Sequence, residues 1–175
     1  YLLIGCSDSR VPPNELTKSN PGEIFIHRNI ANQVNHSDLN CMSVIQYAVE
    51  YLKIDNIIVM GHTKCGGILA ANNKKYLGLI EQWLTNIKDI AINRKSEFED
   101  CKSEEEFITK LTEVNVKMQC LNVCKTPFVQ KAWSEGRDVH VHGWVLDIET
   151  GLIKDLFISN KDWNDVKNIY NFNFE

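Results

Sequence analysis

Two cysteines and one histidine, residue types that ligate zinc, lie just beyond two apolar runs in this sequence. Cys6 follows the run at residues 2–5, and His62 and Cys65 lie in the stretch GHTKCGG after the run at residues 57–60. Ligands bind beyond the carboxyl ends of strands in open α/β sheets, so these side chains converge if the two runs are neighbouring strands. Two thiolates and one imidazole predict a zinc site whose fourth tetrahedral position is open, as in catalytic sites.

Asp8 and Arg10 follow Cys6 closely and add an acid–base element. An arginine can hold a carboxylate through two parallel hydrogen bonds and so keep it ionised. Beside the metal, an ionised Asp8 would accept a proton from zinc-bound water and orient its oxygen. Released from Arg10, Asp8 could instead bind the zinc and close the site. The competing interpretations are a surface ion pair for Asp8 and Arg10, a core thiol for Cys6 and a turn residue for His62.

A nucleophilic role for Cys6 is disfavoured by the same spacing. Phosphatase and sulfur-transferase loops also combine a cysteine with an arginine that holds an anion. Their arginine lies further from the cysteine than Arg10 lies from Cys6. Asp8 would also repel an anionic substrate. Cys6 is therefore predicted to be a metal ligand.

The elements that must position these residues alternate between short apolar strands and amphipathic helices. The predicted strands are 2–5, 23–29 and 57–60, followed by a hairpin around the turn ETG at 149–151. The predicted helices are 42–52, capped by Ser37 or Asp38, then 77–91, 107–121 and 127–136, with a charged surface segment at 94–106. This order predicts an α/β fold with a mostly parallel central sheet, an antiparallel edge strand and flanking helices, in one domain over residues 1–175.

The composition favours a soluble globular protein and excludes several classes of partner. The chain has 175 residues, 43% of them hydrophobic and 24% charged, with a net charge of −4. It has no basic run for nucleic acid, no membrane-spanning apolar stretch and no signal peptide. Its six cysteines are scattered rather than arranged as a disulfide framework, which predicts a reducing compartment, either the cytoplasm or an organelle matrix.

Five stretches carry a resemblance to a known family: CSDSR, PGEIFIHRNIAN, SVIQYAVEYL, GHTKCGG and HGW. In this order and spacing they resemble the β-class carbonic anhydrases over almost the whole chain. The resemblance implies reversible hydration of CO2 to bicarbonate and a proton, by a zinc-bound hydroxide that an Asp8–Arg10 dyad orients. It also implies one zinc ion per chain, with Cys6, His62 and Cys65 as its ligands.

The resemblance further implies a substrate pocket and an assembly. The family's small apolar pocket for CO2 matches Phe25, Ile30 and Tyr47, with the backbone of Gly66 near the zinc-bound group. Members of the family form homodimers or homotetramers with active sites at the subunit interface. The family's N-terminal helix, and a pocket glutamine before its first strand, have no counterpart here. A missing N-terminal segment is therefore expected, and Tyr1 would begin almost inside a strand.

One feature of some family members is not matched. Their second, non-catalytic bicarbonate site uses a tryptophan, an arginine and a tyrosine at the positions of Leu3, Arg28 and Leu146. Arg28 alone is a poor anion clamp, so inhibition by bicarbonate through that route is not expected. Arg28 is predicted to pair with a carboxylate instead. Two thiolates also cancel the formal charge of zinc, so the bound water should be less acidic than on three imidazoles, and CO2 hydration should rise into the alkaline range.

Alternatives to this function remain open from the sequence. The same zinc could hydrolyse CS2 or COS, or the chain could be a non-catalytic zinc- or bicarbonate-binding sensor. Other side chains allow further interpretations. His27 and His36 are candidate proton carriers, His140 and His142 a metal pair or core histidines, and Cys120 and Cys124 a redox pair or packed thiols. Trp83, Trp133 and Trp163 are predicted to be core or interface anchors.

Overall fold

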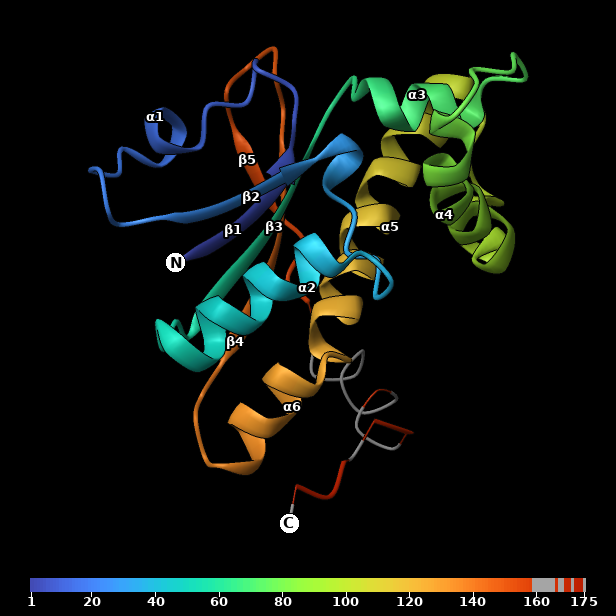
Figure 1. The fold of residues 1–175 in the computed structure, drawn as a ribbon. Helices are drawn as coiled ribbons and strands as arrows, with labels where there is room; N and C mark the ends of the chain where they lie inside the picture. The colour runs from blue at the N-terminus through green and yellow to red at the C-terminus, as the bar shows by residue number, and fades with distance from the viewer. Residues whose placement is uncertain (159–165, 167–168, 171, 175) are drawn as a thin grey trace.

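A computed structural model describes residues 1–158, 166, 169, 170 and 172–174 (Figure 1). The strands are β1 Leu2–Cys6, β2 Phe25–Asn29, β3 Asn56–His62, β4 His140–Leu146 and β5 Ile153–Asp155. The longer helices are α1 Pro13–Thr17, α2 Leu39–Gln46, α3 Gly66–Asn72, α4 Ile80–Asn93, α5 Glu104–Cys124 and α6 Pro127–Ser134. Three short helical turns are η1 Ile30–Asn32, η2 Tyr47–Tyr51 and η3 Lys95–Phe98. The predicted α/β fold is confirmed.

The strands form one sheet in the order β2-β1-β3-β4-β5. β1 pairs in parallel with β2 and β3, β3 pairs in parallel with β4, and β5 runs antiparallel to β4 at the edge. The chain moves outward from β1 to β2 and then crosses to the other side of β1 to form β3. The carboxyl ends of β1 and β3 therefore meet at a topological switch point, where open α/β sheets bind ligands.

The main core lies on the face of the sheet that α2, α5 and α6 cover. Strand residues such as Leu2, Ile4 and Val59 point into it and are fully buried, as are Ile45 of α2 and Val116 of α5. The other face carries a smaller cluster built on Leu3, Ile58, Met60 and Leu146, with Trp144 partly buried beside it. Burial on both faces explains why β1 and β3 read as continuous apolar runs.

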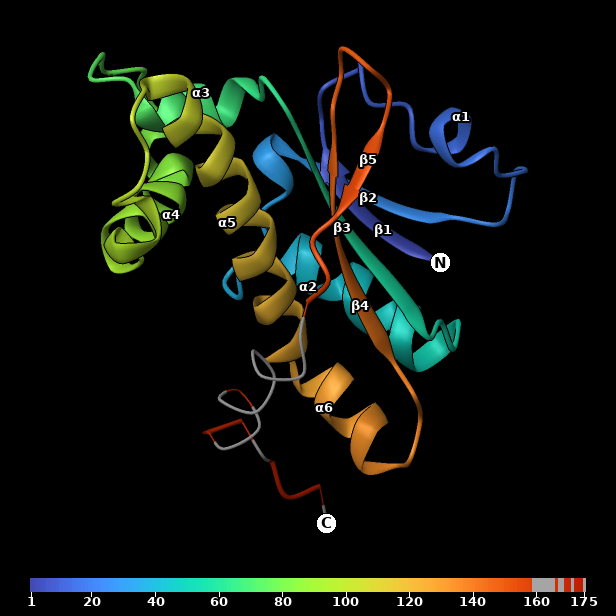
Figure 2. The same ribbon diagram turned by 180° about the vertical axis from the view of Figure 1, so that it is seen from behind.

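A separate group of helices lies to one side of the sheet. Figures 1 and 2 show α3, α4 and the first turns of α5 packed together beyond the end of β3. Their shared core includes Leu84, Ile87 and Leu111, and it extends to Cys6 and Cys65 at the sheet. The cysteines of the predicted metal site therefore lie where the sheet meets this helical group.

Helix boundaries follow local signals, with some departures from the prediction. Asp38 caps α2 by accepting a hydrogen bond from the backbone N–H of Asn40, as predicted. The predicted helix at 77–91 begins only at Ile80, since Gly78 has a φ of +77°. The predicted surface segment 94–106 is anchored by Phe98, which is buried and contacts the ring of Phe107 of α5 in a tilted arrangement at a centroid distance of 4.9 Å.

Two further expectations concern membranes and Trp163. In the part of the chain that the structure describes, every helix is too short or too polar to cross a membrane. Trp163 lies outside the described residues.

Candidate metal centre

The three predicted ligands come together at the switch point. Cys6 ends β1, His62 ends β3, and Cys65 directly precedes the first residue of α3. All three are buried, and their ligand atoms lie within 4.8 Å of one another. The parallel pairing of β1 with β3 places the ends of both strands side by side, so residues far apart in the sequence share one site.

The spacing of the two sulfur atoms fits tetrahedral zinc. Sγ of Cys6 and Sγ of Cys65 are 3.8 Å apart. Two thiolates on a tetrahedral zinc, each with a Zn–S bond of about 2.3 Å, stand roughly 3.8 Å apart. The donor set of two sulfurs and one imidazole also suits zinc, which accepts both ligand types.

The imidazole of His62 is oriented as a metal ligand requires. Its Nδ1 lies 2.9 Å from the backbone carbonyl oxygen of Thr63, and it must carry the hydrogen because a carbonyl only accepts. Nε2 therefore has a free lone pair, and among the described residues this buried atom has no hydrogen-bond partner. A lone pair buried without a donor is costly unless something binds it, so a metal ion fits here.

The two thiols are strongly coupled. A hydrogen bond from Cys65 lowers the pKa of Cys6 to about 4 against the effect of burial, helped by His62 and by the N–H groups of Asp8 and Ala31. That hydrogen bond and burial raise the pKa of Cys65. The pair thus retains one proton, and a divalent cation would displace it, since thiolates are the ligating form.

Asp8 is held by Arg10 as predicted. Nη2 of Arg10 donates to Oδ2 of Asp8 at 2.6 Å, and Nε donates to Oδ1 at 3.0 Å. The backbone N–H of Arg10 donates to Oδ1 as well, at 3.0 Å. These hydrogen bonds from Arg10 hold the pKa of Asp8 well below its usual range, so the carboxylate is ionised.

The backbone of Lys64 also takes part in this arrangement, although the sequence pattern did not point to it. The same Nη2 of Arg10 donates to the carbonyl oxygen of Lys64 at 3.2 Å. Lys64 adopts a left-handed conformation with φ of +53°. Its contribution comes from the main chain, so no side-chain pattern could have revealed it.

The predicted pairing of Arg28 with a carboxylate is wrong. Its guanidinium donates instead to the carbonyl oxygens of Cys6 at 2.7 Å, Asp8 at 2.5 Å and Val11 at 3.0 Å. Three carbonyls of one loop converge on the arginine because the chain bends around it after β1. Arg28 therefore holds the loop that carries Cys6 and Asp8.

The predicted pocket residues fall into two groups. Ile30 and Gly66 lie near the ligands. Gly66 directly follows Cys65. Ile30 follows β2 and packs against Gly67, since a Cβ built on Gly67 would come within 2.8 Å of Cγ2 of Ile30. Phe25 and Tyr47 contact each other at a centroid distance of 5.9 Å. Phe25, however, begins β2 opposite Leu2, roughly 13 Å of strand away from Asn29, the partner of Cys6. Within one chain the structure does not bring Phe25 and Tyr47 to the metal centre.

The two candidate proton carriers, His27 and His36, and the candidate core histidine His142 differ in their surroundings. His27 is buried, and its Nε2 accepts a hydrogen bond from Nδ2 of Asn29, so it is shielded from solvent. His36 is accessible and bonds the carbonyl of Asn122. His142 is half-buried and bonds Oδ1 of Asn56.

The cysteine pair of α5 behaves as packed thiols. Cys120 and Cys124 are free and buried, and Sγ of Cys124 donates to the carbonyl of Cys120 at 2.7 Å.

Comparison with known proteins identifies the family. The family model described as carbonic anhydrase matches residues 1–153. A carbonic anhydrase of Emericella nidulans is 45% identical over 98% of this chain and 75% of its own length. One from Candida albicans is 35% identical over 97% of this chain and 60% of its own length.

Solved structures agree with the sequence comparison. The β-carbonic anhydrase CafA of Aspergillus fumigatus superposes with a TM-score of 0.90 at 33% identity, over 98% of this chain and 83% of that one. A Coccomyxa β-carbonic anhydrase in complex with acetazolamide superposes with a TM-score of 0.84 at 39% identity, over 89% of this chain and 71% of that one. Tetrameric β-carbonic anhydrases are known from Sordaria macrospora. One of them superposes with a TM-score of 0.83 at 36% identity, over 89% of this chain and 79% of that one.

The fold and the site thus define an enzyme of the carbonic anhydrase type. The chain belongs to the β class of that family, as its motifs implied.

Proposed function

We propose that this chain catalyses the reversible hydration of CO2 to bicarbonate and a proton at one zinc ion held by Cys6, His62 and Cys65. The observation that carries the proposal is the convergence of two sulfurs 3.8 Å apart with a buried, unpaired imidazole nitrogen. When bound, zinc would supply a water acidic enough to act as a nucleophile.

Asp8 acts as the acceptor that orients the reacting water. Its Oδ2 lies 3.9 Å from Nε2 of His62, close enough to face a group on the metal. Because Arg10 keeps it ionised, Asp8 has no proton to donate and can only accept a hydrogen bond. This fixes the direction of the hydrogen bond and aims an oxygen lone pair at the substrate.

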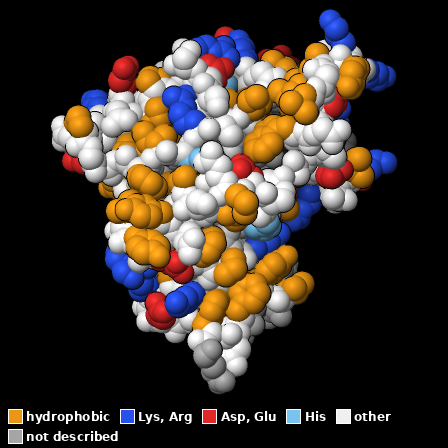
Figure 3. Space-filling model, in the orientation of Figure 1, with side chains coloured by type: hydrophobic (Ala, Val, Ile, Leu, Met, Phe, Trp, Pro, Cys, Tyr) orange, Lys and Arg blue, Asp and Glu red, His pale blue; other side chains and the backbone are white. Residues whose placement is uncertain are grey.

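Ile30 forms an apolar wall beside the metal, and we propose that a second copy of the chain supplies Phe25 and Tyr47. These two aromatic side chains lie at the far end of β2 from their own Cys6. Tyr47 stacks on Tyr51 at a centroid distance of 5.4 Å, and their exposed fractions are 49% and 68%. Figure 3 shows hydrophobic side chains gathered over α2 and η2, which is typical of a surface that another subunit covers.

The whole assembly is therefore a homodimer, or a homotetramer built from such dimers, with each active site at a subunit interface. Residues 1–158 carry every residue of the proposed site, within a single catalytic domain over 1–175. Two ligating thiols also need a reducing compartment, so we place the protein in the cytoplasm or an organelle matrix.

Stopped-flow CO2 hydration at mildly alkaline pH, with the metal content of the same sample, tests the proposal. We expect activity together with about one zinc per chain. Zinc without activity toward CO2 would contradict it. Parallel assays with COS and CS2 then separate a hydrolase of those compounds, which acts on them alone, from a sensor, which acts on none.

A further inference from the structure

The turn η1 beside the metal centre holds an unfavourable backbone conformation. Two consecutive residues with side chains, Ala31 and Asn32, have φ of +60° and +48°. A Cβ clashes with the backbone in this left-handed region, so such residues persist only where their surroundings hold them. Strained residues of this kind cluster at functional sites, so the contacts of this turn bear on the metal centre beside it.

The turn packs against both segments that carry His62 and Cys65. A Cβ on Gly67 would approach Cγ2 of Ile30 to 2.8 Å and Cβ of Ala31 to 3.0 Å. A Cβ on Gly61 would lie 3.3 Å from Oδ1 of Asn32. Gly61 and Gly67 each lie within two positions of a predicted ligand, so a shift of this turn would change the shape of the site.

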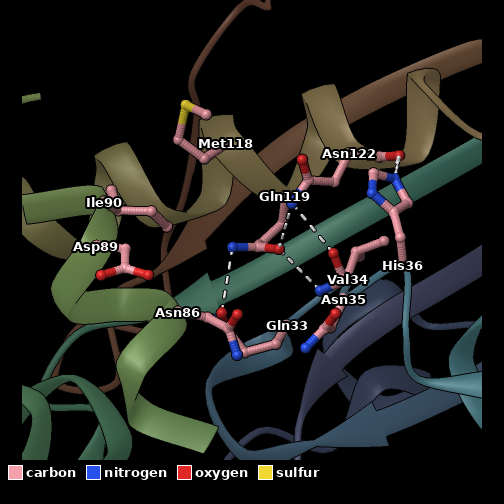
Figure 4. A pocket seen from close by; sticks show the side chains of 10 residues that line it. All are labelled: Gln33, Val34, Asn35, His36, Asn86, Asp89, Ile90, Met118, Gln119 and Asn122. Carbon is pink, nitrogen blue, oxygen red and sulfur yellow. Dashed lines mark hydrogen bonds between the residues drawn. The ribbon is translucent and has the colours of Figure 1, made fainter. Parts of the chain in front are cut away.

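Side chains of α5 hold one side of the turn and the segment after it. Nδ2 of Asn115 donates to the carbonyl oxygen of Ala31 at 3.2 Å, and Nε2 of Gln33 donates to the same oxygen at 2.8 Å. Figure 4 shows Gln119 reaching from α5 to this segment, where its Oε1 accepts from the backbone N–H of Val34. Gln33, Val34 and Gln119 also line a cavity beside this segment, so these lining residues are engaged in holding the chain.

The indole of Trp83, a residue of α4, holds the other side of the turn η1. Nε1 of Trp83 donates to the carbonyl oxygen of Ile30, the first residue of the turn, at 2.8 Å. Ile30 is 40% exposed, which is high for an aliphatic side chain packed against a glycine of α3. This hydrogen bond fixes the peptide immediately before the strained pair.

We propose that Trp83 is a positioning residue for the CO2 pocket. Through the carbonyl of Ile30 it holds η1 in its left-handed form and keeps the Ile30 side chain against Gly67. The inference rests on the proposed function, since Ile30 matters as a pocket wall only if CO2 binds beside it. Trp83 itself need not touch the substrate.

The test compares Trp83→Phe with Trp133→Phe. Phenylalanine keeps an aromatic ring but removes the N–H donor. Trp133 is a matched control, because its Nε1 also donates to a backbone carbonyl, that of Val139 at 2.9 Å, beside α6 and away from the metal centre. For both zinc-loaded variants, kcat and KM for CO2 are measured, together with amide hydrogen exchange over residues 30–36 by mass spectrometry.

We expect Trp83→Phe to raise KM about two- to tenfold with kcat little changed, the range that one neutral hydrogen bond accounts for. Amides of residues 31–34 should exchange faster by a similar factor, while Trp133→Phe changes neither quantity. The proposal would be overturned if Trp83→Phe left both the KM for CO2 and the amide exchange rates unchanged. It would also be overturned if Trp83→Phe and Trp133→Phe changed these quantities equally. If the wild-type protein does not hydrate CO2, the proposed function fails, and the exchange comparison still decides whether Trp83 holds the turn.

Discussion

Oδ2 of Asp8 lies 3.9 Å from Nε2 of His62, the imidazole nitrogen that faces the metal centre. The carboxylate does not reach hydrogen-bonding distance of this nitrogen, because Arg10 holds it through both oxygens. The proposed base is thus kept beside the proposed metal position and separate from its proposed ligands Cys6, His62 and Cys65.

Replacing Asp8 by asparagine should separate catalysis from metal binding. Asp8→Asn keeps the shape of the side chain but removes its negative charge and replaces one acceptor oxygen by an NH2 donor, so the water would lose its anionic acceptor. We expect kcat/KM for CO2 to fall by about 10²–10⁴, with zinc content unchanged. Asp55→Asn is the matched control, because Asp55 also pairs with an arginine, Arg137, away from the site. Loss of zinc in Asp8→Asn would contradict the assignment.

Removing one thiolate should remove the metal. We expect Cys65→Ser to be purified with much less than one zinc per chain and to lose activity in proportion. A chelator should lower the Tm of the wild-type protein, because the ion stabilises the fold that binds it, and should leave the Tm of Cys65→Ser unchanged. Cys41→Ala, which removes a buried thiol outside the site, should keep its zinc. Full zinc in Cys65→Ser would remove Cys65 from the ligand set.

A charge placed on the exposed aromatic surface should break the assembly. Tyr51 is 68% exposed in one chain and stacks on Tyr47, so Tyr51→Asp should leave the monomer folded. We expect sedimentation to show a smaller species, and CO2 hydration to fall with it. Tyr76→Asp, at a tyrosine that is 79% exposed, provides the control. A Tyr51→Asp protein with wild-type assembly would show that the subunit contact lies elsewhere.

Bicarbonate should inhibit only as a reaction product. The N–H groups of Arg28 are engaged with three backbone carbonyls, and Leu3 and Leu146, at the other two positions of that anion site, are buried apolar residues. Initial rates of CO2 hydration should therefore decline hyperbolically with added bicarbonate. A steep, sigmoidal decline would reveal a second anion site.

His27 should make the protein less stable in acid. Burial lowers the pKa of His27, and its Nε2 accepts a hydrogen bond from Asn29, so the folded state favours the neutral ring. The unfolded chain, with a histidine pKa of about 6.5, therefore binds more protons as the pH falls. This contribution to stability is complete above pH 6.5 and is lost below it.

Urea denaturation at pH 7.5 and pH 5.5 measures this effect. The loss of unfolding free energy between the two pH values should be smaller in His27→Gln, whose amide oxygen can accept the same hydrogen bond. An equal loss in both proteins would assign the acid sensitivity to other groups.

The sequence predicted what depends on local pattern and on strand order. Cys6 and His62 could be placed together on the condition that the apolar runs before them are neighbouring parallel strands, which the structure shows. The cap of α2 could be narrowed to Ser37 or Asp38 from residue type, and Asp38 is the one observed. The partners of Arg28 could not be predicted, because its acceptors are main-chain carbonyls of a loop whose path no side chain specifies. The hydrogen bond from Trp83 to Ile30 escaped prediction for the same reason.

The placement of Phe25 required the sheet register. The resemblance assigned Phe25 and Ile30 to one pocket, and they are close in sequence. In an extended strand, however, residues 25 and 29 lie roughly 13 Å apart. Only the pairing of Cys6 with Asn29 reveals which end of β2 faces the ligands.

The two thiols lie 59 positions apart in the chain, at the ends of elements that the crossover through β2 and α2 separates. An ion held by both would act as a reversible cross-link that closes this long loop at the centre of the sheet. Such a link is not released by fraying of the edge strand β5, because β1 and β3 both lie inside the sheet. Capture of the metal by a chelator would therefore open a loop that ties two interior strands together.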